Sequence, residues 1–417
     1  MKQMILEGGH PLSGVIEISG SKNSAVALIP ASLLTNGVIE LINIPEISDI
    51  EALTEILVFL GAKITRENKT MRIDCTKVQN KEIPEQISKR LRASYYFMGA
   101  LLGRYKHVEM YFPGGCSIGA RPINLHLEGF EKLGAKVKVE GNKYTVEADE
   151  LIGNDIYFNI ASVGATINLM LAATYAKGRT TIHNAAREPH VINVANLLNK
   201  MGARVTGAGS STIQIEGITT LESAEIEVVP DYIEAGTYVI AGALCGDHLE
   251  VKNLVPEHIA SLTDALKKMG ADIDIQENKI CVSRVKNYQP IDIKTEVFPG
   301  FPTDLQQPFT PLLALANGIS TINETIFENR FMHIPYLQEM GAKITVVERT
   351  ATIEGSTSFQ AKHVVATDLR AGASLILAAL VAEGETTIDG IEHVLRGYEN
   401  IVLKLMQVGA KISIQEI

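Results

Sequence analysis

Cysteine is scarce in this chain of 417 residues, and its placement carries no signature of a metal or a disulfide. No CxxC pair occurs, and no histidine stands near a cysteine at the spacing of zinc ligands. This pattern argues against a zinc site and a disulfide framework, and it is typical of a reducing cytoplasm. We therefore expect a cytoplasmic protein without a metal. The four cysteines are Cys75, Cys116, Cys245 and Cys281.

Long apolar runs, an export signal and an excess of basic residues are also missing. The longest nearly uninterrupted apolar run, about Ala371 to Ala382, is shorter than the roughly 18 residues of a membrane span. Met1–His10 lacks the charged-then-apolar pattern of a secretory signal, so we expect no export. The net charge is −10, which argues against a protein that coats nucleic acid but permits a local basic pocket. We expect neither a membrane nor a nucleic-acid partner.

The residues that are present favour a folded protein with internal repetition. Hydrophobic residues make up 46% and charged residues 21%, a globular composition whose length suits two to three domains. A short phrase centred on Gly-Ala recurs six times, with glycines at 61, 134, 202, 270, 341 and 409, so successive copies lie 68 to 73 residues apart. The copies are Phe59–Ile64, Lys132–Val137, Lys200–Val205, Lys268–Ile273, Glu339–Ile344 and Gln407–Ile412.

Each phrase stands between a helical pattern and a hairpin pattern. Apolar residues in Asn193–Met201 recur at helix-face spacing, and the glycine that follows suits a helix C-cap, where positive φ is cheap. Lys136–Glu140 and Tyr144–Ala148 alternate like a hairpin. Earlier in each repeat lies an apolar helix such as Gly164–Tyr175, flanked by short strands. One unit is therefore predicted as β-α-β-α-β-β over about 70 residues.

Six such units predict an α/β (α+β) protein of two domains with three repeats each, because one unit is too thin to close a core. The apolar first helices should form the interior, with the more polar second helices outside. We place the boundary near Val229-Pro230, which gives a first domain over residues 21–229 and a second over 230–417. The opening strand within residues 1–20 has no partner of its own, so we expect it to join the second domain.

Polar residues gather in two fixed registers of the repeat. One lies 36 to 42 residues before the C-cap glycine, at the start of the apolar helix, and the other lies 11 to 15 residues before it, ahead of the second helix. The first register holds Lys22, Arg92, Ser162-Val163, Glu234, Asp304 and Arg370, and the second holds Arg121, Arg187, Arg330 and Arg396.

Equivalent positions should converge on one cleft between the two domains. Helix N-termini carry unsatisfied N–H groups and a partial positive charge, so they suit anions, and the added Lys and Arg side chains would make a cationic cavity in an acidic protein. The predicted ligand carries several negative charges. The alternative is that each arginine caps a neighbour or pairs with an acid, and that Asp304 or Glu234 is an N-cap.

The segment Pro113–Pro122 is the sharpest local feature. Three glycines within six residues predict a flexible loop, and Arg121 would favour the thiolate of Cys116. The alternative is an incidental loop thiol. Cys75, Cys245 and Cys281 are predicted to be structural.

Several long motifs then fall in a familiar order. They are Ile18–Asn23, Gly114–Pro122, Ser162–Thr166, Phe301–Asp304, Glu324–His333 and Asp368–Arg370. Together they resemble the enolpyruvyl transferases that use UDP-N-acetylglucosamine and open bacterial peptidoglycan synthesis, and the resemblance covers essentially the whole chain.

The resemblance implies an inside-out α/β barrel in each of two domains, with the active site between them. Such enzymes transfer the enolpyruvyl group of phosphoenolpyruvate to the 3′-hydroxyl of UDP-N-acetylglucosamine and release phosphate, by addition and elimination through a tetrahedral intermediate. Phosphoenolpyruvate carries a carboxylate and a phosphate, and the nucleotide sugar adds a diphosphate, which matches the cationic cavity. No cofactor or metal is implied.

The resemblance also implies roles for individual residues. Cys116 would deliver a proton to the methylene carbon, form a covalent adduct and react with fosfomycin, while Asp304 would accept or orient the sugar hydroxyl proton. The Cys116 loop would close over bound sugar as a lid. Phosphate would be held by Lys22, Arg121 and Arg396, with Lys22 and Arg396 in the catalytic set, and the carboxylate by Arg330 and Arg370. Asn23, Arg92 and Cys116 complete the phosphoenolpyruvate site.

By the same resemblance, the nucleotide sugar would contact Asn23, Arg92, Arg121, Pro122, Ile123, Asn124, Leu125, Ser162, Val163, Gly164, Asp304 and Ile326. The chain departs from the family pattern at Asn124, often Asp, and at Ile160, sometimes Lys. Tyr232 replaces a frequent Arg and His190 a frequent Glu. These departures bear on affinity and leave the reaction type unchanged.

Three alternatives stay open. A 5-enolpyruvylshikimate-3-phosphate synthase shares the architecture, but the Cys116 loop and Ser162–Thr166 favour the nucleotide-sugar enzyme. A paralogue that only binds UDP-N-acetylglucosamine would not need to keep Cys116 and Asp304. A six-repeat sliding clamp would explain the period, but its DNA-facing surface should be basic in every repeat.

Overall fold

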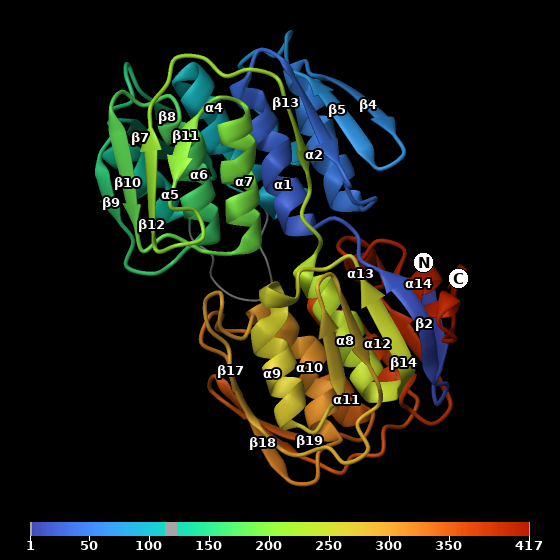
Figure 1. Cartoon of the computed structure of the whole chain (residues 1–417). Coiled ribbons are helices and arrows are strands. Elements are labelled where there is room, and N and C mark those ends of the chain that lie inside the picture. The colour runs from blue at the N-terminus through green and yellow to red at the C-terminus, as the bar shows by residue number, and fades with distance from the viewer. Residues whose placement is uncertain (1, 113–122, 417) are drawn as a thin grey trace. The chain divides into compact units, whose positions relative to one another are not determined.

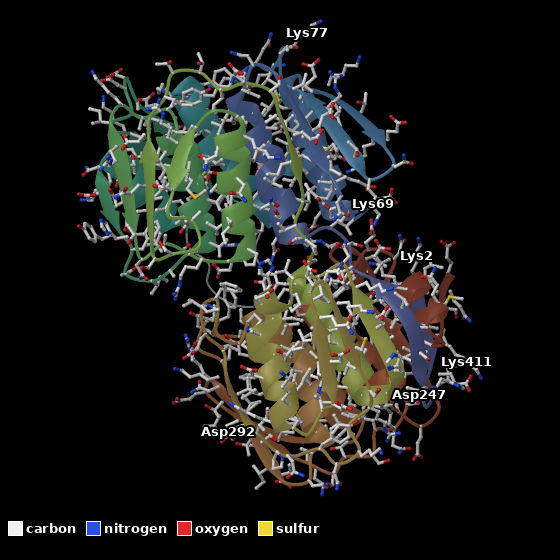
Figure 2. All side chains as sticks on the ribbon, in the orientation of Figure 1. Lys2, Lys69, Lys77, Asp247, Asp292 and Lys411 are labelled. Carbon is white, nitrogen blue, oxygen red and sulfur yellow. The ribbon has the colours of Figure 1, made fainter. Side chains whose placement is uncertain are left out.

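The computed structural model describes residues 2–112 and 123–416 and divides into two compact units. One unit comprises residues 20–112 and 123–229, and the other comprises residues 2–19 and 230–416. Figure 1 shows both units, coloured along the chain. Exposed charged side chains such as Lys69, Lys77 and Asp292 point outward (Figure 2). Throughout the described residues, no helix is both long and apolar enough to cross a membrane.

The third repeat has the β-α-β-α-β-β order that the sequence predicted. Its sheet has the strand order β11-β12-β10-β9, in which β9 runs parallel to β10 and the other pairs are antiparallel. The elements are β9 (Asp155–Tyr157), α6 (Val163–Ala173), β10 (Arg179–His183), α7 (Pro189–Lys200), β11 (Arg204–Thr206) and β12 (Thr212–Glu216).

The fifth repeat has the same element order and the same topology, β17-β18-β20-β19. The elements are β17 (Asp292–Lys294), α10 (Thr303–Ala314), β18 (Ile319–Asn323), α11 (Ile334–Glu339), β19 (Lys343–Val347) and β20 (Thr350–Glu354).

The first and fourth repeats take their parallel first strand from a distant part of the chain. In the first, β13 (Ala224–Glu227) pairs with β3, and in the fourth, β2 (Leu12–Glu17) pairs with β14. The first repeat continues with α1 (Lys22–Ala31), η1 (Ser32–Leu34), β3 (Val38–Ile42), α2 (Ser48–Leu60), β4 (Lys63–Glu67) and β5 (Thr70–Asp74). The fourth has α8 (Tyr232–Cys245), β14 (Gly246–Lys252), η3 (Pro256–Ile259), α9 (Ala260–Lys268), β15 (Ile273–Gln276) and β16 (Lys279–Val282).

The sixth repeat is completed by the opening strand of the chain. β1 (Lys2–Glu7) lies between β22 and β23 and is antiparallel to both, in the place that the last strand of other repeats occupies. The opening segment therefore supplies two strands, β1 and β2, where the sequence suggested one. The other elements are β21 (His363–Val365), α12 (Leu369–Leu380), β22 (Glu385–Asp389), α13 (Glu392–Leu395), α14 (Ile401–Gln407) and β23 (Lys411–Glu416).

The second repeat departs from the predicted order. Among the described residues its sheet has three strands, β6-β8-β7, and no parallel first strand, so the expectation of six elements is wrong here. Two short helical turns precede its inner helix instead. The elements are α3 (Glu85–Ser88), η2 (Arg92–Tyr95), α4 (Tyr96–Tyr105), β6 (His107–Tyr111), α5 (Asn124–Lys132), β7 (Lys136–Glu140) and β8 (Lys143–Glu147).

The six repeat glycines end the second helices, as predicted. All have φ between 92° and 107°, where a side chain is strained and glycine is not. In the first copy the N–H of Ala62 donates to the carbonyl of Leu57 at 2.9 Å, and the N–H of Gly61 donates to Val58 at 2.9 Å. The same pair of bonds closes the other five helices. The Gly-Ala phrase is therefore a helix stop that turns the chain into the hairpin.

The interior of each unit is helical and its sheets lie outside, which is the inside-out arrangement that the resemblance implied. Nearly every residue of α1, α4 and α6 is buried in one unit, and the same holds for α8, α10 and α12 in the other. Helices such as α2 and α9 bury only one face. Each unit has its own hydrophobic core, and the strands surround the helices (Figure 1).

Candidate active-site residues

In the unit that contains residues 230–416, one carboxylate lies between two arginines. Arg330 Nη2 donates to Asp304 Oδ1 at 2.6 Å, and Arg370 Nη2 donates to Asp304 Oδ2 at 3.0 Å. Asp304 and Arg370 lie in the first turns of α10 and α12, whereas Arg330 comes from the loop before α11. Residues of both charge registers thus meet in one ionic group, the Asp304 cluster (Asp304, Arg330 and Arg370).

Both guanidinium groups of this cluster are buried beside aromatic rings. Arg330 lies 5.0 Å from the ring centroid of Phe327, and Arg370 lies 5.3 Å from that of Tyr398. Within the described residues, Arg330 Nε and Nη1 have no hydrogen-bond partner. Buried N–H donors left without an acceptor are costly, and a guanidinium favours carboxylate and phosphate oxygens. The cluster can therefore accept an anion in addition to Asp304.

The segment that carries Arg396 is anchored to the core close to this cluster. Arg396 follows α13 and is partly buried. Two residues later, the buried Tyr398 stands beside Arg370, and its hydroxyl lies 2.8 Å from Thr237 Oγ1 on α8. Ile326, in the loop after β18, is also partly buried. Five of the predicted site residues, all in this unit, thus belong to one neighbourhood of inner-helix starts and adjoining loops.

Glu234, in the same register as Asp304, has a different environment. It is buried, accepts the Ser19 N–H at 2.8 Å and lies 2.7 Å from Lys404 Nζ. Lys404 also donates to Ser19 Oγ at 2.7 Å, and Ser19 Oγ donates to Glu399. Burial raises the pKa of Glu234 to about 7, although the ammonium of Lys404 opposes that shift. Glu234 therefore belongs to an internal network that joins the end of β2, α8 and α14.

In the unit of residues 20–229, Lys22 begins α1 and pairs with a buried acid. Its Nζ lies 2.6 Å from Asp49 Oδ2, and Asp49 lies in the first turn of α2. The N-cap of α1 is Ser21, whose hydroxyl accepts the N–H of Ser24 at 3.3 Å. Asn23 is the second residue of the helix and is partly buried. An ammonium beside a helix N-terminus adds to its positive end, which suits a phosphate.

Arg92 belongs to a second group, in which a histidine that the sequence analysis did not select is central. Arg92 lies 6.0 Å from the ring centroid of Tyr95, and Tyr95 packs edge-on against His126 at 5.2 Å. His126 also lies against Gly164 at the start of α6, where an added Cβ would come within 2.7 Å of Nε2. Neither ring nitrogen has a hydrogen-bond partner in the described part of the chain. Burial, assisted by the charge of Arg92, lowers the pKa of His126 to about 3, so the ring is neutral.

The remaining residues expected at the nucleotide sugar lie near that group. Ser162 caps α6 by accepting the N–H of Ala165 at 3.3 Å. Ile123 and Leu125 flank the start of α5, where the exposed Asn124 donates to Glu128 at 3.3 Å. Val163 and Gly164 follow Ser162 as the first residues of α6. The starts of η2, α5 and α6 are thus brought together by Tyr95, His126 and Gly164.

The four departures from the family pattern have distinct environments. Ile160 is 63% exposed, so its side chain leaves a surface position without charge. Tyr232 is buried against His258 and Phe298, with ring centroids 6.3 and 6.2 Å away. His190 is buried in the first turn of α7. Tyr232 and His190 are therefore part of the packing around the starts of α8 and α7.

Cys116, Arg121 and Pro122 lie outside the described residues. Of the other cysteines, Cys75 and Cys245 are buried, and burial raises their pKa to about 11 and about 12. Cys281 is also buried, and its pKa is raised, first by burial and then by Glu250. Thiols with raised pKa values are poor nucleophiles. In the part of the chain that the structure describes, no group of three or more His, Cys, Asp and Glu side chains could hold a metal ion.

The residues missed by the sequence analysis are partners of those it selected. Asp49 and His126 carried a weak signal: Asp49 opens the second helix of its repeat, and His126 follows Leu125 in the same segment. Asp49 lies 12 residues before Gly61 and so falls within the second register, where the residues selected are all arginines, whereas His126 lies 8 residues before Gly134 and falls in neither register. Their importance depends on which neighbour folding brings to them.

Comparison with known proteins places these residues in a family context. The family described as EPSP synthase (3-phosphoshikimate 1-carboxyvinyltransferase) matches residues 6–405. UDP-N-acetylglucosamine 1-carboxyvinyltransferase 2 of Listeria monocytogenes serovar 1/2a is 48% identical over 411 residues, which cover 99% of this chain and 97% of that protein. UDP-N-acetylglucosamine 1-carboxyvinyltransferase of Clostridium botulinum is 47% identical over 414 residues and 99% of each chain.

Solved structures agree with the fold. The enolpyruvyl transferase NikO from Streptomyces tendae superposes with a TM-score of 0.90 at 25% identity over 99% of both chains. EPSP synthase from Acinetobacter baumannii superposes with a TM-score of 0.77 over the full length of both chains, and at 19% identity this likeness concerns the fold alone.

Proposed function

The chain belongs to the EPSP synthase family of enolpyruvyl transferases, and on that premise we propose that it acts on phosphoenolpyruvate and UDP-N-acetylglucosamine. It transfers the enolpyruvyl group to the 3′-hydroxyl of the sugar and releases phosphate, the first committed step of peptidoglycan synthesis in the cytoplasm. The name shared by relatives 47–48% identical over nearly the whole chain supports this acceptor over shikimate 3-phosphate. The structural observation that carries the proposal is the Asp304 cluster, which combines an acceptor for a proton with buried donors for an anion.

Two groups of cationic side chains bind phosphoenolpyruvate, one at its carboxylate and the other at its phosphate. Arg330 and Arg370 bind its carboxylate, because guanidinium N–H groups match carboxylate oxygens and Arg330 has spare buried donors. The phosphate is held by Lys22, Arg121 and Arg396, with Asn23 and Arg92 also in the site. Lys22 supports this role from a helix N-terminus, where the helix dipole favours a dianion.

The chemistry requires two proton movements. Cys116 gives its thiol proton to the methylene carbon of phosphoenolpyruvate while the sugar oxygen bonds to the neighbouring enol carbon, and Asp304 takes the hydroxyl proton. The resulting tetrahedral intermediate then loses phosphate while its methyl group returns a proton to the Cys116 thiolate, which restores the double bond and the thiol. The surrounding cations stabilise the phosphate as it departs. The same Cys116 sulfur forms the covalent adduct when it attacks the enol carbon itself.

Binding of the nucleotide sugar uses the group around His126 and the start of α6. Arg92, Arg121–Leu125 and Ser162–Gly164 contact it, with Asp304 and Ile326 near the sugar. The exposed Ile160 supplies no cation to the diphosphate, and Asn124 accepts a hydrogen bond without a negative charge. We expect Ile160 and Asn124 to change the affinity for UDP-N-acetylglucosamine and to leave the type of reaction unchanged.

Phosphate release tests the proposal. The protein is incubated with phosphoenolpyruvate alone, with UDP-N-acetylglucosamine added, or with shikimate 3-phosphate added. Release that requires the nucleotide sugar is expected. Release only with shikimate 3-phosphate would show that shikimate 3-phosphate is the acceptor. Binding of the nucleotide sugar without phosphate release would show that the protein is a paralogue that only binds it.

A further inference from the structure

The first residue after the second strand of a repeat, the strand that follows the inner helix, joins that strand to its parallel neighbour in four of the repeats. In three repeats this residue is an asparagine with left-handed φ of 55° to 60°, namely Asn43, Asn184 and Asn253. Their side-chain amides donate to the first carbonyl after the parallel strand, that of Val228, Phe158 and Ile18, at 3.3, 3.1 and 2.8 Å. An asparagine is therefore enough to connect the ends of these two parallel strands by a hydrogen bond.

The fifth repeat has Glu324 at this position, and the direction of the hydrogen bond between the two strand ends is reversed. The first residue after the parallel strand is Thr295, and here the hydroxyl of Thr295 donates to Glu324 Oε1 at 3.0 Å. The carboxylate is fully buried. Burying a carboxylate costs several kcal/mol unless donors surround it, so an acid is an energetically costly replacement for the amide that three other repeats use.

Donors from three segments converge on this carboxylate. Oε1 also accepts the backbone N–H groups of Ile326 at 2.9 Å and Phe327 at 3.1 Å, and Oε2 accepts the hydroxyl of Thr303 at 2.8 Å. Every one of these donors is neutral. An asparagine or glutamine side chain has one acceptor oxygen, whereas a carboxylate accepts at two, so only an acid satisfies the whole set.

The bonded segments are those that carry the Asp304 cluster. Thr303 is the first residue of α10 and directly precedes Asp304, while Phe327 stands against the guanidinium of Arg330. Arg330 in turn donates to Asp304. Glu324, the start of α10 and the loop to Arg330 therefore form a closed circuit, in which moving one member displaces the others.

We propose that Glu324 is a positioning residue for the transfer reaction, which holds Asp304 and Arg330 in register through Thr303 and the 326–327 backbone. The proposal rests on the proposed function, because that function gives Asp304 and Arg330 their roles. Glu324 itself touches no substrate. Its contribution is geometric: a displacement of about 1 Å at reacting groups lowers rates by as much as roughly 100-fold.

Two substitutions with a matched control test this role. Glu324→Asn introduces the residue that three repeats use at this position, and Thr303→Val removes one donor with little change of shape. Both should lower kcat by roughly 10- to 100-fold per folded molecule, with a smaller change in KM for phosphoenolpyruvate, and Thr303→Ser should restore the rate. The control is Thr386→Val in β22, a buried threonine of the same unit whose hydroxyl has no partner in the described residues, and its kcat should be unchanged.

The possible results separate the two proposals. A wild-type kcat in folded Glu324→Asn, or equal effects of Thr303→Val and Thr386→Val, would overturn the positioning role. If Glu324→Asn does not fold, the threonine series decides alone. If wild-type protein releases no phosphate, the proposed function fails, and amide exchange over residues 325–330 is the remaining readout. It should rise in Thr303→Val and not in Thr386→Val, and the absence of a rise would refute the circuit.

Discussion

Asp304 is held by two guanidinium groups that an incoming carboxylate also needs. Its charge makes it a competent proton acceptor, and the same charge competes with phosphoenolpyruvate for Arg330 and Arg370. The two tasks therefore oppose each other at a single residue, and an uncharged replacement separates them.

We expect Asp304→Asn to lower kcat by roughly 10²- to 10⁴-fold, because the amide cannot accept the hydroxyl proton. Phosphoenolpyruvate should bind at least as tightly, because Asn competes less for the two arginines. Rapid-mix rates and calorimetric titration with phosphoenolpyruvate measure the two effects. Weaker binding by tenfold or more would show that Asp304 supports the anion site and does not compete with it.

Cys116 should behave as an acid that other acids can replace. Cys116→Ala is expected to abolish product formation nearly completely, whereas Cys116→Asp should retain turnover, because a carboxylic acid can donate the proton. Fosfomycin with UDP-N-acetylglucosamine present should modify the wild-type thiol and leave the aspartate variant active, as intact-mass spectra and rates would record. A fully active alanine variant would remove the general-acid role.

At this scale the sequence indicated the charged residues better than their partners. Asp304, Arg330 and Arg370 were found because each occupies a register that is polar in several repeats. Glu324 opens one of the selected motifs but sits where three repeats have asparagine. Asp49 is an acid in a register that was selected for its arginines, and His126 falls in no charged register, so the local sequence marks these residues only weakly. Their significance arises from donors and rings that folding brings from elsewhere in the chain, such as Thr303 and Tyr95.

Among the elements, the Gly-Ala helix stops are the most predictable feature, because positive φ is a local demand that glycine meets by itself. The pairing of strands was harder to predict from the sequence. Nothing within the second repeat shows that its parallel first strand is absent from the described residues, and the split of the sixth repeat into α13 and α14 carries no sequence signal of comparable strength. Local chemistry predicts how an element ends, while its neighbours depend on long-range pairing.

Two of these helix stops make a matched pair of substitutions. Gly202→Ala places a Cβ in open space at φ 102°, so its cost is the left-handed backbone alone, about 1–2 kcal/mol. Gly61→Ala has the same φ but brings the Cβ to 2.8 Å from the Lys77 carbonyl oxygen, so it should destabilise more. Thermal unfolding of both variants measures the difference. Equal losses would mean that the Lys77 segment moves aside freely.

On the scale of a whole unit, the Glu234 network links stability to pH. Because burial raises the pKa of Glu234 to about 7, its proton is bound in the folded protein at pH values where the unfolded chain has lost it. Its contribution is greatest below the ordinary glutamate pKa and is lost as the pH rises through 7. Lys404 limits that loss by stabilising the ionised form.

Lys404→Met should therefore destabilise the protein more at pH 8 than at pH 5.5, because without the ammonium the pKa of Glu234 rises further. Melting temperatures at the two pH values test this. Lys411→Met is the control: its exposed pair with Glu7 should contribute little at either pH. An equal decrease for Lys404→Met at both pH values would show that the lysine acts by packing alone.

The strand β1 has a consequence for how the chain can be cut and joined. Lys2 in β1 pairs with Glu416 in β23, so the two ends of the chain lie on adjacent strands, about 5 Å apart. A circular permutant that starts at Pro230 and links residue 417 to residue 1 would make residues 230–417 and 1–19 one continuous sequence. Such a segment contains every strand of its own sheets and its own core, so it should fold when expressed by itself.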